Sequence, residues 1–127
     1  MELKFNIVSD DTEFAKKQSN SLKSWIQDEE ELEIDKIEQL RDELNPDDAG
    51  GALLSAFKTL MSGNPIEQLA KTIQVWLRER SKTEIAKVST FNLEIEKPDG
   101  TKFILDAKNL GANEKELIEN ITLGLKG

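Results

Sequence analysis

Two residue types that carry much of enzyme chemistry are missing from this sequence. The 127 residues include no cysteine and no histidine. Their absence excludes thiolate nucleophiles, zinc sites of the usual Cys/His type, haem ligation through histidine and every catalytic triad with an imidazole base. A chain of this length buries enough apolar surface to fold without a disulfide or a metal. We therefore expect a single domain over residues 1–127, with no cofactor and no metal.

Long hydrophobic runs are also lacking. In the most apolar stretch the longest uncharged run extends from Ala49 to Phe57, far short of the roughly 20 residues that a membrane-spanning helix needs. The first residues, MELKFNIVSDD, show no basic segment followed by a long apolar run, so they predict neither a secretory signal nor a transit peptide. We expect a cytoplasmic protein that does not bind membranes.

Basic charge is scarce. The formal net charge is -8 and the pI is about 4.7, so nucleic acids and anionic membranes would be repelled. The excess lies between Asp28 and Asp48, where eleven acids accompany two bases. Such a run is usually a solvated surface, and the alternative is a docking surface for a basic patch on a partner protein. The candidate protein-binding residues are acids at the two ends of this run and the glycine pair after it: Asp28, Glu29, Glu30, Glu31, Asp47, Asp48, Gly50 and Gly51.

The first part of the chain predicts a strand followed by a helix. Residues 2–8 alternate between apolar and polar side chains, as a half-buried strand does. Asp10 or Asp11 can then cap a helix whose apolar residues recur at helical spacing as far as Trp25 and Ile26. We expect this helix to end near Gln27.

The periodicity from Leu32 to Leu44 fits two structures. Leu32 and Ile34 alternate like a strand, whereas Ile37, Leu40 and Leu44 recur at helical spacing. Local reasoning leaves both alternatives open. We favour a short strand over residues 33–39, partly because of the family resemblance described below, with an acidic loop after it.

The stretch DDAGGALLSAFKTLMSGNP, from Asp47 to Pro65, predicts the first arm of a helical hairpin. Asn64-Pro65-Ile66-Glu67 then predicts the start of the second arm, with asparagine as the N-cap and proline at the first helical position. An apolar stripe that includes Trp76 follows, and Arg78, Arg80 and Lys82 lie near its end, where the helix dipole favours cations.

The last part of the chain predicts a hairpin and a helix. Residues 83–96 and 101–108 form two strands around Lys97-Pro98-Asp99-Gly100, and a change in their alternation predicts a bulge near Ser89 or Thr90. Asn113 caps the final helix. The elements therefore follow the order strand, helix, strand, helix, helix, strand, strand, helix.

This order predicts the α+β class. We expect a two-layer sandwich in which helices pack on a mixed sheet of about four strands. Trp25 and Trp76 both lie on apolar helical faces, so we assign both to the core, with an anchor for a binding partner as the alternative.

Two catalytic or nucleotide-binding interpretations of the apolar stretch have little support. The residues after Gly50-Gly51 do not include the later glycine and the lysine that a phosphate-binding loop has at fixed spacing. Ser55-Ala56-Phe57-Lys58 has the Ser-x-x-Lys spacing of penicillin-binding enzymes, but their Ser-Asp-Asn and Lys-Thr-Gly motifs are missing. We therefore interpret Ser55 as a small helix residue and Lys58 as a solvent-facing lysine, with a serine hydrolase as the remote alternative.

Five short motifs, taken in their order and spacing, resemble the effector-associated constant component family. These small proteins belong to multi-gene bacterial conflict systems, where they accompany caspase-like or trypsin-like peptidase effectors and sensor NTPases. The resemblance covers nearly the whole chain. The motifs are Leu22-Lys23-Ser24-Trp25-Ile26, Gly50-Gly51-Ala52-Leu53, Ser62-Gly63-Asn64-Pro65, Val75-Trp76-Leu77-Arg78-Glu79-Arg80, and Lys97-Pro98-Asp99-Gly100-Thr101 with Leu105-Asp106-Ala107.

The resemblance implies an accessory, non-catalytic adaptor of an antiphage or conflict system. Such a protein would bind a peptidase effector or a sensor NTPase encoded nearby. The long acidic segment from Asp28 to Asp48 departs from the family's usual sequence, which puts a shared docking surface in question. A homo-oligomeric scaffold of the same system, built through the exposed side of the two central helices, is the alternative.

Overall fold

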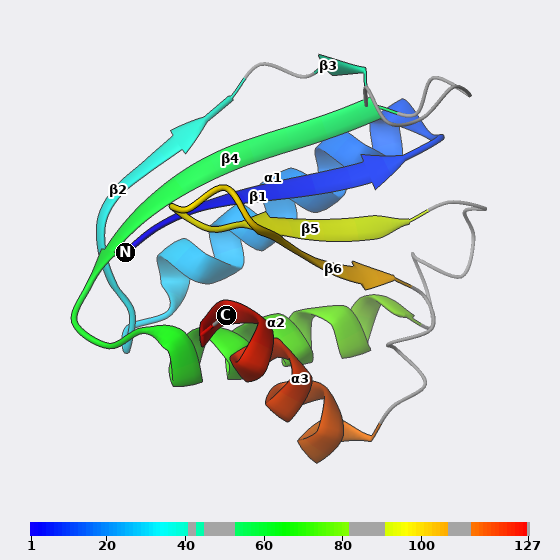
Figure 1. Ribbon diagram of the computed structural model, residues 1–127. Helices are drawn as coiled ribbons and strands as arrows, with labels where there is room; N and C mark the ends of the chain where they lie inside the picture. The colour runs from blue at the N-terminus through cyan, green and yellow to red at the C-terminus, as the bar shows by residue number, and fades with distance from the viewer. Residues whose placement is uncertain (41–42, 45–52, 82–90, 107–112, 127) are drawn as a thin grey trace.

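The described part of the chain forms a six-stranded sheet and three helices. The computed structural model describes residues 1–40, 43–44, 53–81, 91–106 and 113–126 (Figure 1). The strands are β1 (Glu2–Ser9), β2 (Glu33–Gln39), β3 (Glu43–Leu44), β4 (Leu53–Ser62), β5 (Asn92–Glu96) and β6 (Lys102–Asp106). The helices are α1 (Thr12–Asp28), α2 (Ile66–Ser81) and α3 (Glu114–Lys126).

The strand order in the sheet is β2-β4-β1-β5-β6, and the short β3 also pairs with β4. Every strand pair in the described ranges is antiparallel. The expected α+β fold is thus confirmed. The sheet differs in detail from the expectation, because it has five strands along its main path rather than about four and is antiparallel rather than mixed.

The helices cover one face of the sheet (Figure 1). Alternation along β1 directs Leu3, Phe5 and Ile7 into the core, where the rings of Phe5 and Phe57 stack with their centroids 5.0 Å apart. Apolar residues of all three helices join this core, including Leu22, Trp76 and Leu117. The opposite face of the sheet, here called the open face, carries the even-numbered residues of β1 and β4.

The expected first arm of a helical hairpin is wrong. Residues 53–62 form β4, which pairs with β1 on one side and with β2 on the other. Leucine, alanine, lysine and methionine favour a helix locally, but the segment also alternates, and Phe57, Thr59 and Met61 turn their side chains into the core. Pairing along both edges of the strand outweighs the local preference. Residues 53–62 therefore supply a strand, and not the first of the two central helices on which the expected oligomer surface depended.

Several predicted boundaries are confirmed. Asp11 caps α1 and accepts a hydrogen bond from the backbone N–H of Phe14 at 3.0 Å. The favoured strand over residues 33–39 is β2. Helix α2 begins directly after Asn64-Pro65, and Asn113 caps α3 by accepting from the backbone N–H of Glu116 at 2.8 Å.

The β5–β6 hairpin closes through the predicted turn. The backbone N–H of Gly100 donates to the carbonyl of Lys97 at 2.9 Å, and that of Lys97 donates to the carbonyl of Thr101 at 2.9 Å. Gly100 has φ 88°, a conformation that favours glycine. This pattern is a three-residue hairpin loop. The bulge expected near Ser89 or Thr90 lies outside the described residues.

Asp99 accepts two hydrogen bonds in this turn. These bonds predict the direction in which its pKa shifts. The hydroxyl of Thr101 donates to Asp99 Oδ1 at 2.6 Å and the backbone N–H of Thr101 at 2.9 Å. These bonds, the hydroxyl's first and then the backbone's, lower the pKa of Asp99 below its usual 3.8. A lowered pKa contributes stability that is present above pH 3.8 and is lost as the pH falls through the folded-state value.

We expect an NMR titration to place the Asp99 midpoint below 3.8. Thr101→Val should raise the midpoint towards 3.8, because it removes the hydroxyl donor and leaves the backbone donor. Thr101→Ser keeps a hydroxyl and should preserve the low midpoint. A wild-type midpoint at or above 3.8 would contradict the hydrogen-bonding described here.

Candidate protein-binding site

The C-terminal end of α1 presents a group of acidic side chains. The helix ends at Asp28, and the backbone N–H of the C-cap Glu29 donates to the carbonyl of Ile26 at 3.3 Å. Glu29 Oε1 in turn accepts from the backbone N–H of Glu31 at 3.2 Å. Asp28, Glu30 and Glu31 are exposed and Glu29 is partly buried. The turn therefore holds four carboxylates close to the helix end.

Acids are unfavourable at this position. A helix carries a partial negative charge at its C-terminus, where lysine or arginine is the stabilising choice. The last turn of α1 contains no basic residue. Local electrostatics therefore opposes this arrangement, and such local conflicts are expected at sites that serve binding rather than stability.

An open groove of about 390 Å³ separates this end of α1 from α2. We call it the Trp25 groove. Its apolar surface includes Trp25, which is partly buried, and Val75, which is 42% exposed. The complete lining is Trp25, Asp28 and Glu29 from α1 with Gln68, Lys71, Thr72 and Val75 from α2. The groove thus combines an apolar wall with an acidic edge.

Arg80 fixes the indole that forms this wall. Its guanidinium carbon lies 5.4 Å from the ring centroid of Trp25 and 5.1 Å from that of Trp76. Arg80 Nε also donates to Gln18 Oε1 at 3.1 Å, and Trp76 Nε1 donates to Ser21 Oγ at 3.2 Å. Because both rings contact the same cation, Arg80 holds the Trp25 ring in place against Trp76.

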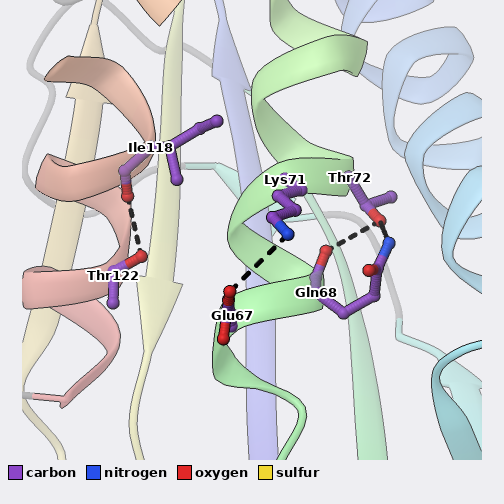
Figure 2. A network of polar contacts seen from close by, with 6 residues as sticks. All are labelled: Glu67, Gln68, Lys71, Thr72, Ile118 and Thr122. Atoms are coloured by element: carbon purple, nitrogen blue, oxygen red, sulfur yellow. Dashed lines mark hydrogen bonds and ion pairs between the residues drawn. The ribbon is translucent and has the colours of Figure 1, made fainter. Parts of the chain in front are cut away.

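Polar contacts along α2 order the far side of the groove (Figure 2). Thr72 Oγ1 donates to the carbonyl of Gln68 at 3.0 Å, and Gln68 Nε2 donates to Thr72 Oγ1 at 3.5 Å. Lys71 pairs with Glu67 one turn earlier, with 3.6 Å between Nζ and Oε1. The ammonium group nearest the groove therefore already has a carboxylate on its own helix.

The structure brings only some of the predicted binding residues to this site. Asp28 and Glu29 line the groove, and Glu30 and Glu31 continue from the same turn. The other candidates lie outside the described residues: Asp47, Asp48, Gly50 and Gly51.

The two tryptophans have different positions. Trp76 is fully buried, which confirms its assignment to the core. Trp25 packs against the core but is only partly buried. Sequence reasoning missed the contribution of Arg80, although its spacing of four residues from Trp76 on one helix was a usable signal.

The two residues on which the remote serine hydrolase alternative rested do not meet in the structure. Ser55 and Lys58 lie on strand β4 and not on a helix. Residues three apart on a strand direct their side chains to opposite faces, and Ser55 is buried at 1% exposure while Lys58 is partly exposed. Lys58 therefore cannot take a proton from Ser55 through direct contact.

These features define a small α+β protein with helices on one face of an antiparallel sheet and an acidic, tryptophan-lined groove between two of them. A family model described as Effector Associated Constant Component 1 matches residues 10–126. The chain belongs to this family, as the resemblance of its motifs indicated. No curated protein and no solved structure matches it. None of the helices that the structure describes has the length and apolar character that a membrane span requires.

Proposed function

We propose that this protein is a non-catalytic component that binds an effector protein through the Trp25 groove. The observation that carries the proposal is the acidic end of α1 beside a partly exposed tryptophan. The family description, an effector-associated component, supports this proposal. The partner suggested by the resemblance is a caspase-like or trypsin-like peptidase effector, or a sensor NTPase, encoded nearby in a bacterial conflict system.

The chemistry of the groove suggests what the partner presents. Tryptophan is one of the residue types enriched among those that dominate binding energy, and an anchored ring loses little entropy on binding. Val75 adds exposed apolar surface beside it. An apolar side chain flanked by lysine or arginine would fill the groove and neutralise the carboxylates of Asp28 and Glu29.

A basic partner would also relieve the unfavourable charge at the end of α1. In the free protein, acids at a helix C-terminus cost roughly 0.3–1 kcal/mol each where they are exposed. Binding of a cation there removes this cost. Stability of the free protein and affinity for the partner are therefore expected to change in opposite directions when these acids are replaced.

This opposition provides the test. Asp28→Lys with Glu30→Lys should abolish co-purification of the effector encoded beside this protein, and should leave or slightly raise the melting temperature of the free protein. Val75→Lys, which introduces a charge into the apolar part of the groove, should also abolish co-purification. Glu119→Lys is the matched control, because it reverses an exposed acid on α3 and lies outside the Trp25 groove.

The control should bind as the wild type does. The proposal fails if no neighbouring gene product co-purifies with the wild type. It also fails if the groove variants retain the partner, or if Glu119→Lys loses it to the same extent. The melting temperatures distinguish lost binding from lost folding.

A further inference from the structure

The strand at one end of the sheet has an exposed apolar residue at its centre. β6 is the last strand in the order β2-β4-β1-β5-β6, and no other strand in the described ranges pairs with its outer side. Ile104, the middle residue of β6, is 49% exposed on the open face. Exposed edge strands with apolar residues are templates for pairing with another chain, and proteins usually protect them.

The hairpin determines which backbone groups of β6 point outwards. Lys97 and Thr101 form a hydrogen-bonded pair at the start of the ladder. Hydrogen-bonded and non-hydrogen-bonded pairs alternate in an antiparallel ladder, so Phe103 and Leu105 also bond to β5. The N–H and C=O groups of the even-numbered residues 102, 104 and 106 are therefore directed away from β5.

The sequence of β6, Lys-Phe-Ile-Leu-Asp, is complementary to itself when it is read antiparallel. We propose that two copies of this protein form a two-fold symmetric dimer in which β6 pairs with β6. The symmetry axis passes between the two Ile104 residues. Lys102 then lies opposite Asp106 of the second copy, and Phe103 lies opposite Leu105. The sheets of the two copies join into one continuous antiparallel sheet.

Backbone geometry and side-chain chemistry select the same register. The outward-directed backbone N–H and C=O groups of one copy can pair only with those of the other copy, so the register can change only in steps of two residues. A shift of one such step would place Ile104 opposite Lys102 or Asp106 of the second copy. The register centred on Ile104 instead pairs all five residues and forms two oppositely charged pairs, each of them stabilising across antiparallel strands.

The joined sheet gains contacts chiefly on its open face. On the open face the two Ile104 side chains cover each other between the charged pairs. On the helix face Phe103, which is only partly buried, lies opposite Leu105 of the second copy, which is already buried in its own core. Asp106 also interacts within its own chain, and a carboxylate has enough acceptor sites for a further donor. The dimer and the Trp25 groove share no residue, so this inference stands apart from the proposed function.

Sedimentation equilibrium of the purified protein, from low micromolar to near-millimolar concentration, tests the dimer. We expect the wild type to reach the mass of a dimer and Ile104→Lys to remain a monomer, because two ammonium groups would meet at the axis. Lys102→Glu should weaken the dimer roughly tenfold, since both symmetric pairs become repulsive. Adding Asp106→Lys to Lys102→Glu should restore it, because the exchanged charges face each other again.

Leu123→Lys is the control, because Leu123 is the most exposed large apolar residue described, at 69%, and lies on α3. It should dimerise as the wild type does. A wild type that stays monomeric throughout overturns the proposal. A dimer that Leu123→Lys dissociates and Ile104→Lys does not also overturns it. The same holds if the double variant Lys102→Glu with Asp106→Lys dimerises no more tightly than Lys102→Glu alone. Far-UV circular dichroism on each variant verifies that the strand still folds.

Discussion

Trp76→Ala is expected to lower the free energy of unfolding by about 3–5 kcal/mol. The indole of Trp76 is fully buried in the core and contacts the guanidinium of Arg80 on one face. Its Nε1 also donates to Ser21 Oγ. Removal of the ring leaves a cavity and takes one of the two aromatic contacts from Arg80. Because small domains have total stabilities of about 5–15 kcal/mol, this variant should be close to unfolding.

Urea denaturation followed by far-UV circular dichroism measures the loss. Trp76→Phe should cost less, because it fills most of the cavity but cannot donate the hydrogen bond to Ser21. Trp25→Phe is the matched control on the other side of Arg80, and we expect a small loss because Trp25 is only partly buried. If the free energy of unfolding of Trp76→Ala lies within 1 kcal/mol of the wild-type value, Trp76 does not have the buried core position described here.

Gly124→Ala is expected to destabilise the protein, although alanine is the best helix former. A Cβ atom at Gly124 would lie 2.4 Å from two ring carbons of Phe103 on β6, much closer than atoms pack. Overpacking of this kind costs about 1–3 kcal/mol, whereas the gain in helix propensity is about 1 kcal/mol. We expect a net loss of up to about 2 kcal/mol, since either α3 or the ring has to move.

The same denaturation experiment separates the two effects. Asn120→Ala, at an exposed position of α3, should be neutral or slightly stabilising because it tests propensity alone. Phe103→Leu should reduce the cost of Gly124→Ala, because it removes the ring that the new methyl group would meet. A Gly124→Ala variant more stable than the wild type would show that α3 does not approach β6 as closely as described.

Capping residues and periodicity predicted most of the fold. The Asp11 cap of α1, the start of α2 after Pro65 and the Asn113 cap of α3 depend on interactions within a few residues, which the local sequence specifies. Strand β1 has distant partners, but its alternation of apolar and polar residues marks it locally. The favoured strand β2 is correct, but the decision between strand and helix there depended on the family resemblance.

The helix predicted for residues 53–62 is wrong, because the interactions that make this segment the strand β4 are with residues elsewhere in the chain. Its leucine, alanine and lysine residues prefer helices, and only pairing with β1 and β2 makes the extended conformation favourable. Strand partners that are distant in sequence leave no local signal. The same argument applies to the Ser-x-x-Lys spacing of Ser55 and Lys58. Residues three apart lie on the same face of a helix but on opposite faces of a strand.

The candidate site was predictable in its charge but not in its shape. The acidic run identified Asp28 to Glu31 as candidate binding residues, and that part needed only composition. The groove depends on how α1 crosses α2 and on Arg80, which contacts both tryptophans. Neither could be read from the separate helices, because tertiary packing brings Trp25 and Val75 together.

Hydrogen exchange of the backbone amides, compared between the free protein and its complex with the co-purified effector, tests the proposed docking surface most directly. We expect the effector to slow exchange at the C-terminal end of α1, around residues 25–31, and along residues 68–75 of α2. Residues 114–126 of α3 should exchange as in the free protein. Protection confined to α3 or to the open face of the sheet, with unchanged exchange around Trp25, would contradict effector binding through this groove.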